Sequence, residues 1–400
     1  METPRLRHMN EPECGGRQAD RPLRWRAPLA AAGLGVAAFL GSRILGRSPH
    51  FVESIYTSGI WPYISRPVAR ATGLFPFALG EILIALYVLF LLAVAGVGVT
   101  AAIRRTRSWR NVFAHGALRA VRDLGVIVFL FYLLWGFNYA RPRFETQAGW
   151  PDWDGVAIDE LVTLTERAVI ESNRAYIDLH GSLDAGRPTA LPADRAALDA
   201  ALDRGWELAT PLLALPDAAA LRFGPVKRPL ASPILARFGI VGIYFPFTAE
   251  TNILRDLPAV LAPAAMAHEK AHQRGSTSEA EANFLGMIAA ALAPDRHARY
   301  SAAMNAQSQL ANTLIRRDVT EWRRIGQQRI PGVVRDLRDV DAYFQQFRGI
   351  GQAIGGAIND RYLRANRVPD GARDYGRSVR LLITWARRNN GSPLPDSTTE

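Results

Sequence analysis

Two histidines four residues apart carry the strongest chemical signal in this sequence. The segment MAHEKAHQRGSTSEAEANFL, which begins at Met266, contains His268 and His272, with Glu269 beside the first of them. On a helix this spacing places both imidazoles on one face, one turn apart, where they can bind a single metal ion. The pattern H-E-x-x-H is typical of metalloproteases, in which the glutamate acts as general base. Glu269 is therefore the candidate catalytic residue, because it can reach a water molecule on that metal.

A third metal ligand is expected from the helix that follows at once. Gly275 can end the first helix, and a tight reversal there would point the first turn of the next helix back at the metal. Glu279 and Glu281 lie in that turn, and hydrolytic zinc sites combine two histidines with one carboxylate. We favour Glu279, because it stands four residues before Asn283, which could orient a histidine. Glu281 is the alternative, since both glutamates also fit the capping pattern and dipole of a helix N-terminus.

The group that would stabilise the oxyanion is not marked by a motif. Residue type alone makes Tyr375, Tyr244 and His297 candidates, and each also suits a purely structural role. The β-branched and aromatic segment 238–254, just before the histidine motif, predicts one or two short strands. Such a strand could pair with an extended peptide substrate, or be an ordinary edge strand or loop.

Apolar blocks near the N-terminus predict three transmembrane helices. A span needs about 20 mostly apolar residues, and we expect helices over residues 27–46, 74–102 and 124–140. The first block is short and follows arginines, so a cleavable signal peptide is its alternative. Arginines are concentrated in the tail 1–26 and between the second and third blocks, which predicts that both of these lie in the cytoplasm. Three crossings then place residues 144–387, with the histidine motif, on the extracytoplasmic side of the cytoplasmic (inner) membrane.

The rest of the chain predicts a mainly α-helical domain with a small β element. Helical patterning starts at Ile158 and returns after the strand segment, with helices expected at 296–326, 352–366 and 372–388 among others. Residues 144–387 are enough for a core of their own, and 388–400 are expected to form a flexible tail. The single cysteine, Cys14, excludes a disulfide framework and a cysteine-based zinc site.

The excess of basic residues favours a membrane over nucleic acid as partner. The net charge is +11, and arginine supplies nearly all of the positive charge. Many of these arginines flank the apolar blocks or alternate with acidic residues, and no module that stacks bases on aromatic rings is evident. We therefore expect the arginines to meet lipid headgroups. The glycine-spaced segment 349–356 lacks the preceding strand and the acidic residue of a phosphate-binding loop.

Several segments together make the chain similar to the membrane family catalogued as domain of unknown function 3810. The matching segments are IYTSGIWPYISRP, GLFPFALGEIL, LLWGFNYARP, GIVGIYFPFTAETN, HEKAHQRGSTSEAEANFLG and YGRSVRLL. They cover most of residues 50–385. The resemblance implies a membrane-anchored zinc metallopeptidase that carries an HExxH signature.

The segment after the histidines also resembles the E-x-x-x-D helix of membrane gluzincin peptidases. In those enzymes the first glutamate is a metal ligand, which maps to Glu279, but this chain has Asn283 in place of the aspartate. The gap after the second histidine is much shorter here and is nearer to the metzincin pattern H-E-x-x-H-x-x-G-x-x-H. In that pattern the third ligand would fall on Ser278, which cannot replace histidine.

The sequence thus predicts a membrane-anchored metallopeptidase with a zincin-like domain that acts on peptide or protein substrates. Zn²⁺ is the expected cofactor, with His268, His272 and Glu279 as ligands and Glu269 as general base. The alternative is a non-catalytic binding or scaffold protein in the lipid bilayer, whose metal site is structural or vestigial. The sequence carries no signal of oligomeric state.

Overall fold

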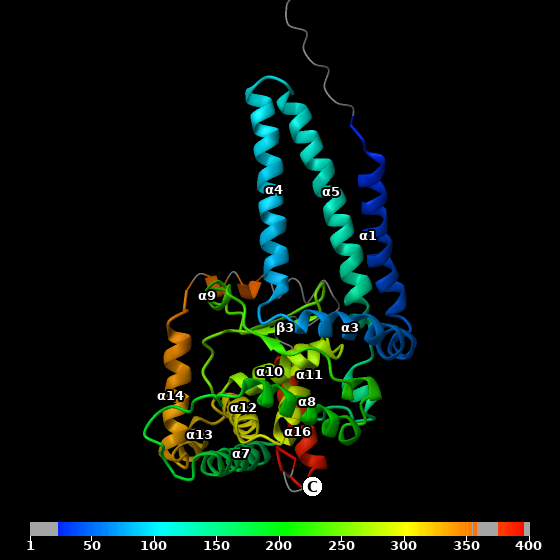
Figure 1. Ribbon diagram of the computed structural model, residues 1–400. Helices are drawn as coiled ribbons and strands as arrows, with labels where there is room; N and C mark the ends of the chain where they lie inside the picture. The colour runs from blue at the N-terminus through cyan, green and yellow to red at the C-terminus, as the bar shows by residue number, and fades with distance from the viewer. Residues whose placement is uncertain (1–22, 350, 354, 358–374, 396–400) are drawn as a thin grey trace, which may run out of the picture. The chain divides into compact units, whose positions relative to one another are not determined.

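The chain is mainly α-helical, with one small sheet (Figure 1). The structure is a computed structural model that describes residues 23–349, 351–353, 355–357 and 375–395. These residues confirm the predicted class, mainly α with a small β element. They divide into two compact units.

The first unit contains most of three long helices. It holds the described residues up to Ala37, together with Ile84–Phe129. The helices that contribute to it are α1 (Arg26–Leu45), α4 (Leu79–Ile103) and α5 (Trp109–Leu134). Gly125 on α5 lies against α1, where an added Cβ would be 2.4 Å from the carbonyl oxygen of Ala31. Glycine therefore allows these two helices to pack closely.

Two helices among the described residues are long and apolar enough to cross a membrane. They are α1 and α4, and the most apolar window of α4 has no buried residue, so α4 is not the core helix of a soluble protein. Both match predicted spans, although α4 begins at Leu79 rather than at residue 74. These helices indicate association with a membrane.

The predicted third span, residues 124–140, is not among the described helices that are long and apolar enough to cross a membrane. Helix α5 begins at Trp109, and the part before Leu124 carries Arg110, Arg119 and Arg122. It ends at Leu134, so its apolar part is about 16 Å long, roughly half the thickness of a bilayer core. The aromatic residues that follow continue into a 3-10 helix, η2 (Gly136–Ala140), instead of extending the span.

The second unit contains the small sheet and the remaining helices. It comprises Ala38–Leu83 and the described residues from Leu130 onwards. Before the sheet it contains α2 (Pro49–Phe51), the π-helix η1 (Val52–Ile60), α3 (Trp61–Gly73), η2, α6 (Phe144–Gln147), α7 (Ile158–His180), α8 (Arg195–Leu212) and η3 (Asp217–Ala220). The sheet region contains β1 (Val226–Lys227), α9 (Ser232–Arg237), β2 (Gly242–Phe245) and β3 (Glu250–Ile253). The last helices are α10 (Ala262–Gln273), α11 (Glu279–Leu292), α12 (Arg296–Leu314), α13 (Val319–Gly326), α14 (Pro331–Gln345) and α16 (Tyr375–Arg388).

The prediction of one helix over residues 296–326 is corrected to two, α12 and α13. Asp318 starts the second, because its side chain accepts hydrogen bonds from the backbone N–H groups of Thr320 and Glu321. Of the predicted helix 352–366, residues 352–353 and 355–357 are helical and the others lie outside the described residues. Residues 372–374, at the start of the last predicted helix, also lie outside the described residues.

The sheet has the strand order β1-β3-β2. Strands β2 and β3 are antiparallel, with Tyr244 opposite Thr251, and both lie in the predicted strand segment. Strand β1, which the sequence analysis missed, is parallel to β3. Below the sheet, α10 and α11 pack side by side, and α11 also contacts α8 and α16. Gly205 on α8 allows this approach, because an added Cβ there would lie 2.0 Å from the carbonyl oxygen of Ala289 on α11.

A buried ion pair connects the sheet to the first turn of α4. The carboxylate of Glu250 on β3 accepts hydrogen bonds from the backbone N–H groups of Leu79 (2.9 Å) and Gly80 (2.7 Å). Lys227 on β1 donates to the same carboxylate and to the carbonyl oxygen of Thr72. Glu250 thus satisfies N–H groups that a helix N-terminus leaves without partners, and its charge favours that end of the helix dipole.

We expect Glu250→Ala to destabilise the second unit by about 3–5 kcal/mol, because it leaves the buried charge of Lys227 without its partner. Denaturant titration of the protein in detergent micelles measures this loss. The matched control is Glu166→Ala, which breaks an ion pair with Arg324 at the surface and should cost much less. Equal losses in the two variants would contradict the structural role of Glu250.

Candidate metal centre

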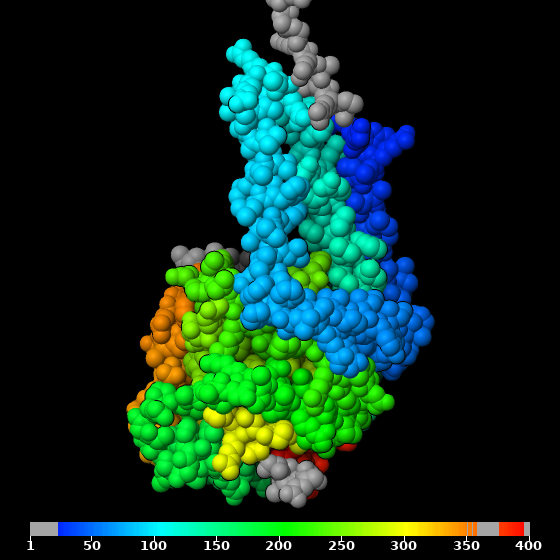
Figure 2. Space-filling model, viewed as in Figure 1, coloured from blue at the N-terminus to red at the C-terminus, as the bar shows by residue number. Residues whose placement is uncertain are grey.

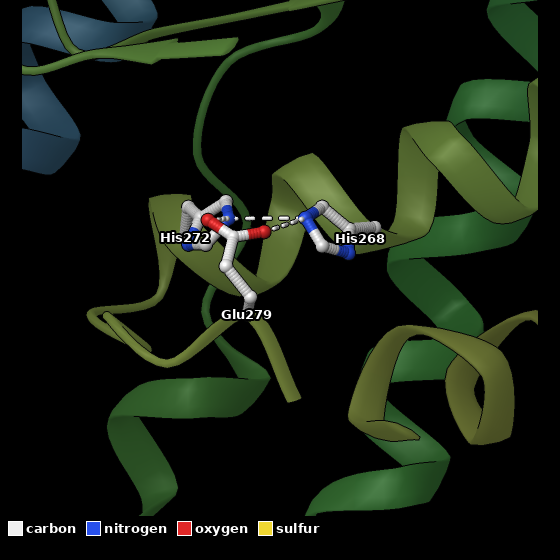
Figure 3. A group of neighbouring side chains, drawn as sticks. All are labelled: His268, His272 and Glu279. Carbon is white, nitrogen blue, oxygen red and sulfur yellow. Dashed lines mark hydrogen bonds and ion pairs between the residues drawn. The ribbon is translucent and has the colours of Figure 1, made fainter. Parts of the chain in front are cut away.

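Helix α10 presents the histidine motif in one continuous helical turn. Pro263 lies in its first turn, where the missing N–H costs nothing, and alanines fill much of the helix. The helix ends at Gln273, and Gly275 follows with a positive φ of +89°, a backbone conformation that favours glycine. His268 and His272 therefore lie one turn apart on the same face of α10 (Figure 3).

Helix α11 begins directly after this turn and carries the third side chain. Ser278 is its N-cap, and the serine hydroxyl accepts a hydrogen bond from the backbone N–H of Glu281. Further along, Gly286 lies against α10, where an added Cβ would be 2.7 Å from the backbone nitrogen of His268. This close packing brings Glu279, the first residue of α11, to the two histidines.

Three ligand atoms converge between the two helices. The Nε2 atoms of His268 and His272 are 3.1 Å apart. The carboxylate oxygens of Glu279 lie 3.4 Å from Nε2 of His268 and 3.7 Å from Nε2 of His272. Ligand atoms about 2.0–2.2 Å from a tetrahedral zinc ion would be about 3.3–3.6 Å from one another. The three observed distances are close to this range, so the side chains could hold one metal ion.

The hydrogen bonds of the outer ring nitrogens orient both histidines toward this point. Nδ1 of His268 donates to the side-chain oxygen of Asn283 (2.9 Å), and Nδ1 of His272 donates to the carbonyl oxygen of Ser276 (2.7 Å). A neutral imidazole carries one N–H group, so both Nε2 atoms present lone pairs to each other. Two facing lone pairs at this distance repel each other unless a cation lies between them. The donor set could thus hold a metal ion, and Asn283 has the orienting position that the sequence predicts.

The surroundings of the two histidines shift their pKa values in opposite directions. Burial lowers the pKa of His268, but the nearby negative charges of Glu279 and Glu269 outweigh burial and raise the pKa overall. Burial dominates at His272 and lowers its pKa, which keeps this ring neutral. A neutral imidazole is the form that binds metal.

Glu269 lies beside the cluster in a confined apolar setting. Its side chain is 4% exposed, and Oε2 has no hydrogen-bond partner in the part of the chain that the structure describes. Gly242 on β2 covers it so closely that an added Cβ would lie 2.3 Å from Oε1. Burial raises the pKa of Glu269 to about 8; nearby His268 lowers it, and Glu279 raises it further. Burial therefore favours the protonated form of this side chain.

The structure brings Glu279, and not Glu281, to the histidines. The carboxylate of Glu281 accepts hydrogen bonds from Arg377 on α16 (2.6 Å) and from the backbone N–H of Phe144 (3.0 Å). In the described ranges, His268, His272 and Glu279 are the only group of three such residues close enough to hold a metal ion. Metal binding itself stays a prediction.

Of the candidate oxyanion donors, Tyr244 and His297 form no hydrogen bond or ion pair with the two histidines among the described residues. Tyr244 lies in an aromatic cluster, and burial raises the pKa of its hydroxyl, which has no hydrogen-bond partner within the described part. His297 lies near Asp295 at the start of α12, 3.8 Å away. Tyr375 is the first residue of α16, and its side chain lies outside the described residues.

Trp135 forms part of the wall of the site, although its position in the sequence does not indicate this. The indole packs edge-on near the imidazole of His272, with ring centroids 6.4 Å apart, and also contacts Tyr244 at 4.8 Å. Trp135 directly follows α5, and a tryptophan at the end of an apolar segment indicates only an anchor in the lipid headgroups. No local spacing could have connected it with a histidine so distant along the chain.

Comparison with known proteins supports the resemblance to domain of unknown function 3810. A family model described as protein of unknown function (DUF3810) matches residues 56–383, a range that includes the sheet, α10 and α11. Searches of curated proteins and of solved structures each found no match. Because the family model covers most of its length, the chain belongs to the DUF3810 family of proteins of unknown function.

Proposed function

We propose that this protein is a membrane-anchored, zinc-dependent metallopeptidase. The observation that carries the proposal is the convergence of His268, His272 and Glu279 beside a buried glutamate. Two imidazoles and one carboxylate are the ligand set of hydrolytic zinc sites, which keep a fourth position for water. A scaffold protein would need the ligands but would have no need of Glu269.

The residues around the ligands support hydrolysis of a peptide bond. Bound zinc would lower the pKa of its water to about 7 and polarise the scissile carbonyl group. Glu269 would accept the proton of that water through Oε2 and pass it to the leaving amine. A bound dication would favour the ionised form of this buried carboxyl group, and Oε2, which has no hydrogen-bond partner among the described residues, would be free to accept the proton.

Strand β2 could hold the substrate beside Glu269. In the sheet order β1-β3-β2, this strand lies at the edge, and its first residue, Gly242, contacts the Glu269 carboxylate. An extended peptide could add to such an edge through backbone hydrogen bonds. Tyr244 faces the same side of β2 as Gly242, which favours it among the candidate oxyanion donors.

The membrane topology that we propose places this site outside the cytoplasm. Residues Ala38–Leu83 and those from Leu130 onwards belong to one compact unit, so they lie on the same side of the membrane. The chain between them would therefore leave with α4 and return with α5, which packs against α1 at Gly125. The connection between α4 and α5 carries Arg104, Arg105 and Arg107, and short arginine-rich connections remain in the cytoplasm.

We expect the purified protein to contain about one zinc ion per chain, and His268→Ala to lose it, because the remaining two ligands cannot hold zinc. Elemental analysis after dialysis measures the metal. His297→Ala is the matched control, since that histidine lies elsewhere on α12, and it should retain its zinc. Retention of zinc by His268→Ala would exclude the proposed site.

We expect Glu269→Gln to keep its zinc but to cut an unfolded protein such as casein about 10²–10⁴-fold more slowly, because the amide cannot accept a proton. Release of labelled peptides from casein measures the rate. Glu166→Gln, at the surface of α7, serves as the control and should cut at the rate of the unchanged protein. Full activity of Glu269→Gln, or no zinc-dependent cutting by the unchanged protein, would favour the scaffold alternative.

We expect alkaline phosphatase fused after residue 400 to be active, because this reporter folds only outside the cytoplasm, where its disulfides form. Phosphatase inserted after Arg105 should be inactive. Colony assays of the two fusions measure the difference. The reverse result would place the candidate site in the cytoplasm.

A further inference from the structure

Strand β2 connects the candidate general base with the start of an apolar helix. Its first residue, Gly242, touches the carboxylate of Glu269. Its last residue, Phe245, touches α4, because a Cβ added to Gly80 would lie 2.7 Å from the ring of Phe245. A strand rises about 3.3 Å per residue, so these two contacts are about 10 Å apart along β2.

The first turn of α4 is fixed to this region at two further points. Glu250 on β3 accepts the N–H groups of Leu79 and Gly80, as described above. Glu81 in the same turn accepts the backbone N–H groups of Leu230 (3.1 Å) and Ala231 (3.0 Å), just before α9. The start of α4 is therefore a rigid part of the second unit, and its distance from Glu269 is set by the sheet.

Exposed apolar side chains lie on the segments next to this turn. They are Leu74 (84% exposed), Phe75, Phe77, Leu230 (71% exposed) and Ile234. Arg70 at the end of α3 and Arg237 at the end of α9 are exposed on the same segments. Figure 2 shows that the segment with α3, in blue, covers part of the second unit drawn in green. Apolar side chains with arginines beside a spanning helix match the composition of a surface that enters lipid headgroups.

We propose that the candidate active site lies at the bilayer surface and that its substrates are extended peptide segments next to a membrane anchor. This substrate class rests on the proposed peptidase function. A peptide added to the edge of β2 runs between Glu269 and the start of α4. The bond near Gly242 is then cut about 10 Å from the membrane, a distance that three extended residues span.

The depth of β2 can be measured without any assay of activity. With Cys14 replaced by serine, single cysteines introduced by Ile243→Cys or Ile170→Cys carry a fluorescent label. The two isoleucines are equally exposed, at 39%, and α7, which carries Ile170, lies on the side of the second unit away from the sheet (Figure 1). In vesicles that contain nitroxide-headgroup lipid, we expect quenching several-fold stronger at position 243. Equal quenching at both positions would overturn the location, and His268→Ala should leave the result unchanged.

The substrate class is tested with two membrane-anchored fusions of the same parts. In one, a disordered peptide joins the anchor to a folded domain; in the other, the folded domain separates the anchor from the peptide. We expect the peptide next to the anchor to be cut about tenfold faster, because its effective concentration at the site is higher. Equal rates would overturn the substrate class. Strong quenching at position 243 with neither fusion cut would contradict the peptidase and leave the location standing, so the two failures are distinguishable.

Discussion

The tight turn between α10 and α11 determines where the candidate ligands lie. Gly275 adopts a positive φ there, and a side chain at this position would meet Thr57, Trp61 and Arg141. Glycine at 286 then lets α11 pack against the backbone of α10. Because the turn at Gly275 and the packing at Gly286 fix the position of α11 on α10, the first residue of α11, Glu279, lies next to the two imidazoles. The convergence of the ligands thus follows from backbone packing, before any metal binds.

Buried charges on the opposite face of α10 fix the rotation of this helix. Lys270, between the two histidines in the sequence, is fully buried and forms ion pairs with Asp199 and Asp203 on α8. Arg274 also pairs with Asp203. Burial raises the pKa of Asp203, but these two cations outweigh it and lower the pKa overall, so the carboxylate stays charged. Any rotation of α10 would separate these charges in a buried setting, at a cost of several kcal/mol, and so the histidines keep their direction.

Local spacing predicted the parts of the site that lie within one helical hairpin. The two histidines, the reversal at Gly275 and the preference for Glu279 all follow from contacts a few residues apart, which sequence patterns record. The choice between Glu279 and Glu281 was open in the sequence, because both lie in one helical turn. In the structure Glu281 forms an ion pair with Arg377, a residue far away in the chain. Long-range partners of this kind leave no periodic signal.

Long-range contacts also explain why the sequence suggests a boundary between the membrane region and the candidate domain that the structure does not have. The end of α5 was expected to be a span, but its apolar run stops at Leu134, where the carbonyl oxygen accepts a hydrogen bond from the indole of Trp61. Next to it, Trp135 turns toward His272 and excludes water from one side of the ring. Electrostatic interactions are stronger where water is excluded, so this wall would strengthen the attraction of the candidate ligands for a cation. The segments beside the apolar helices therefore do more than attach the chain to a membrane: they complete the environment in which the candidate metal centre would work.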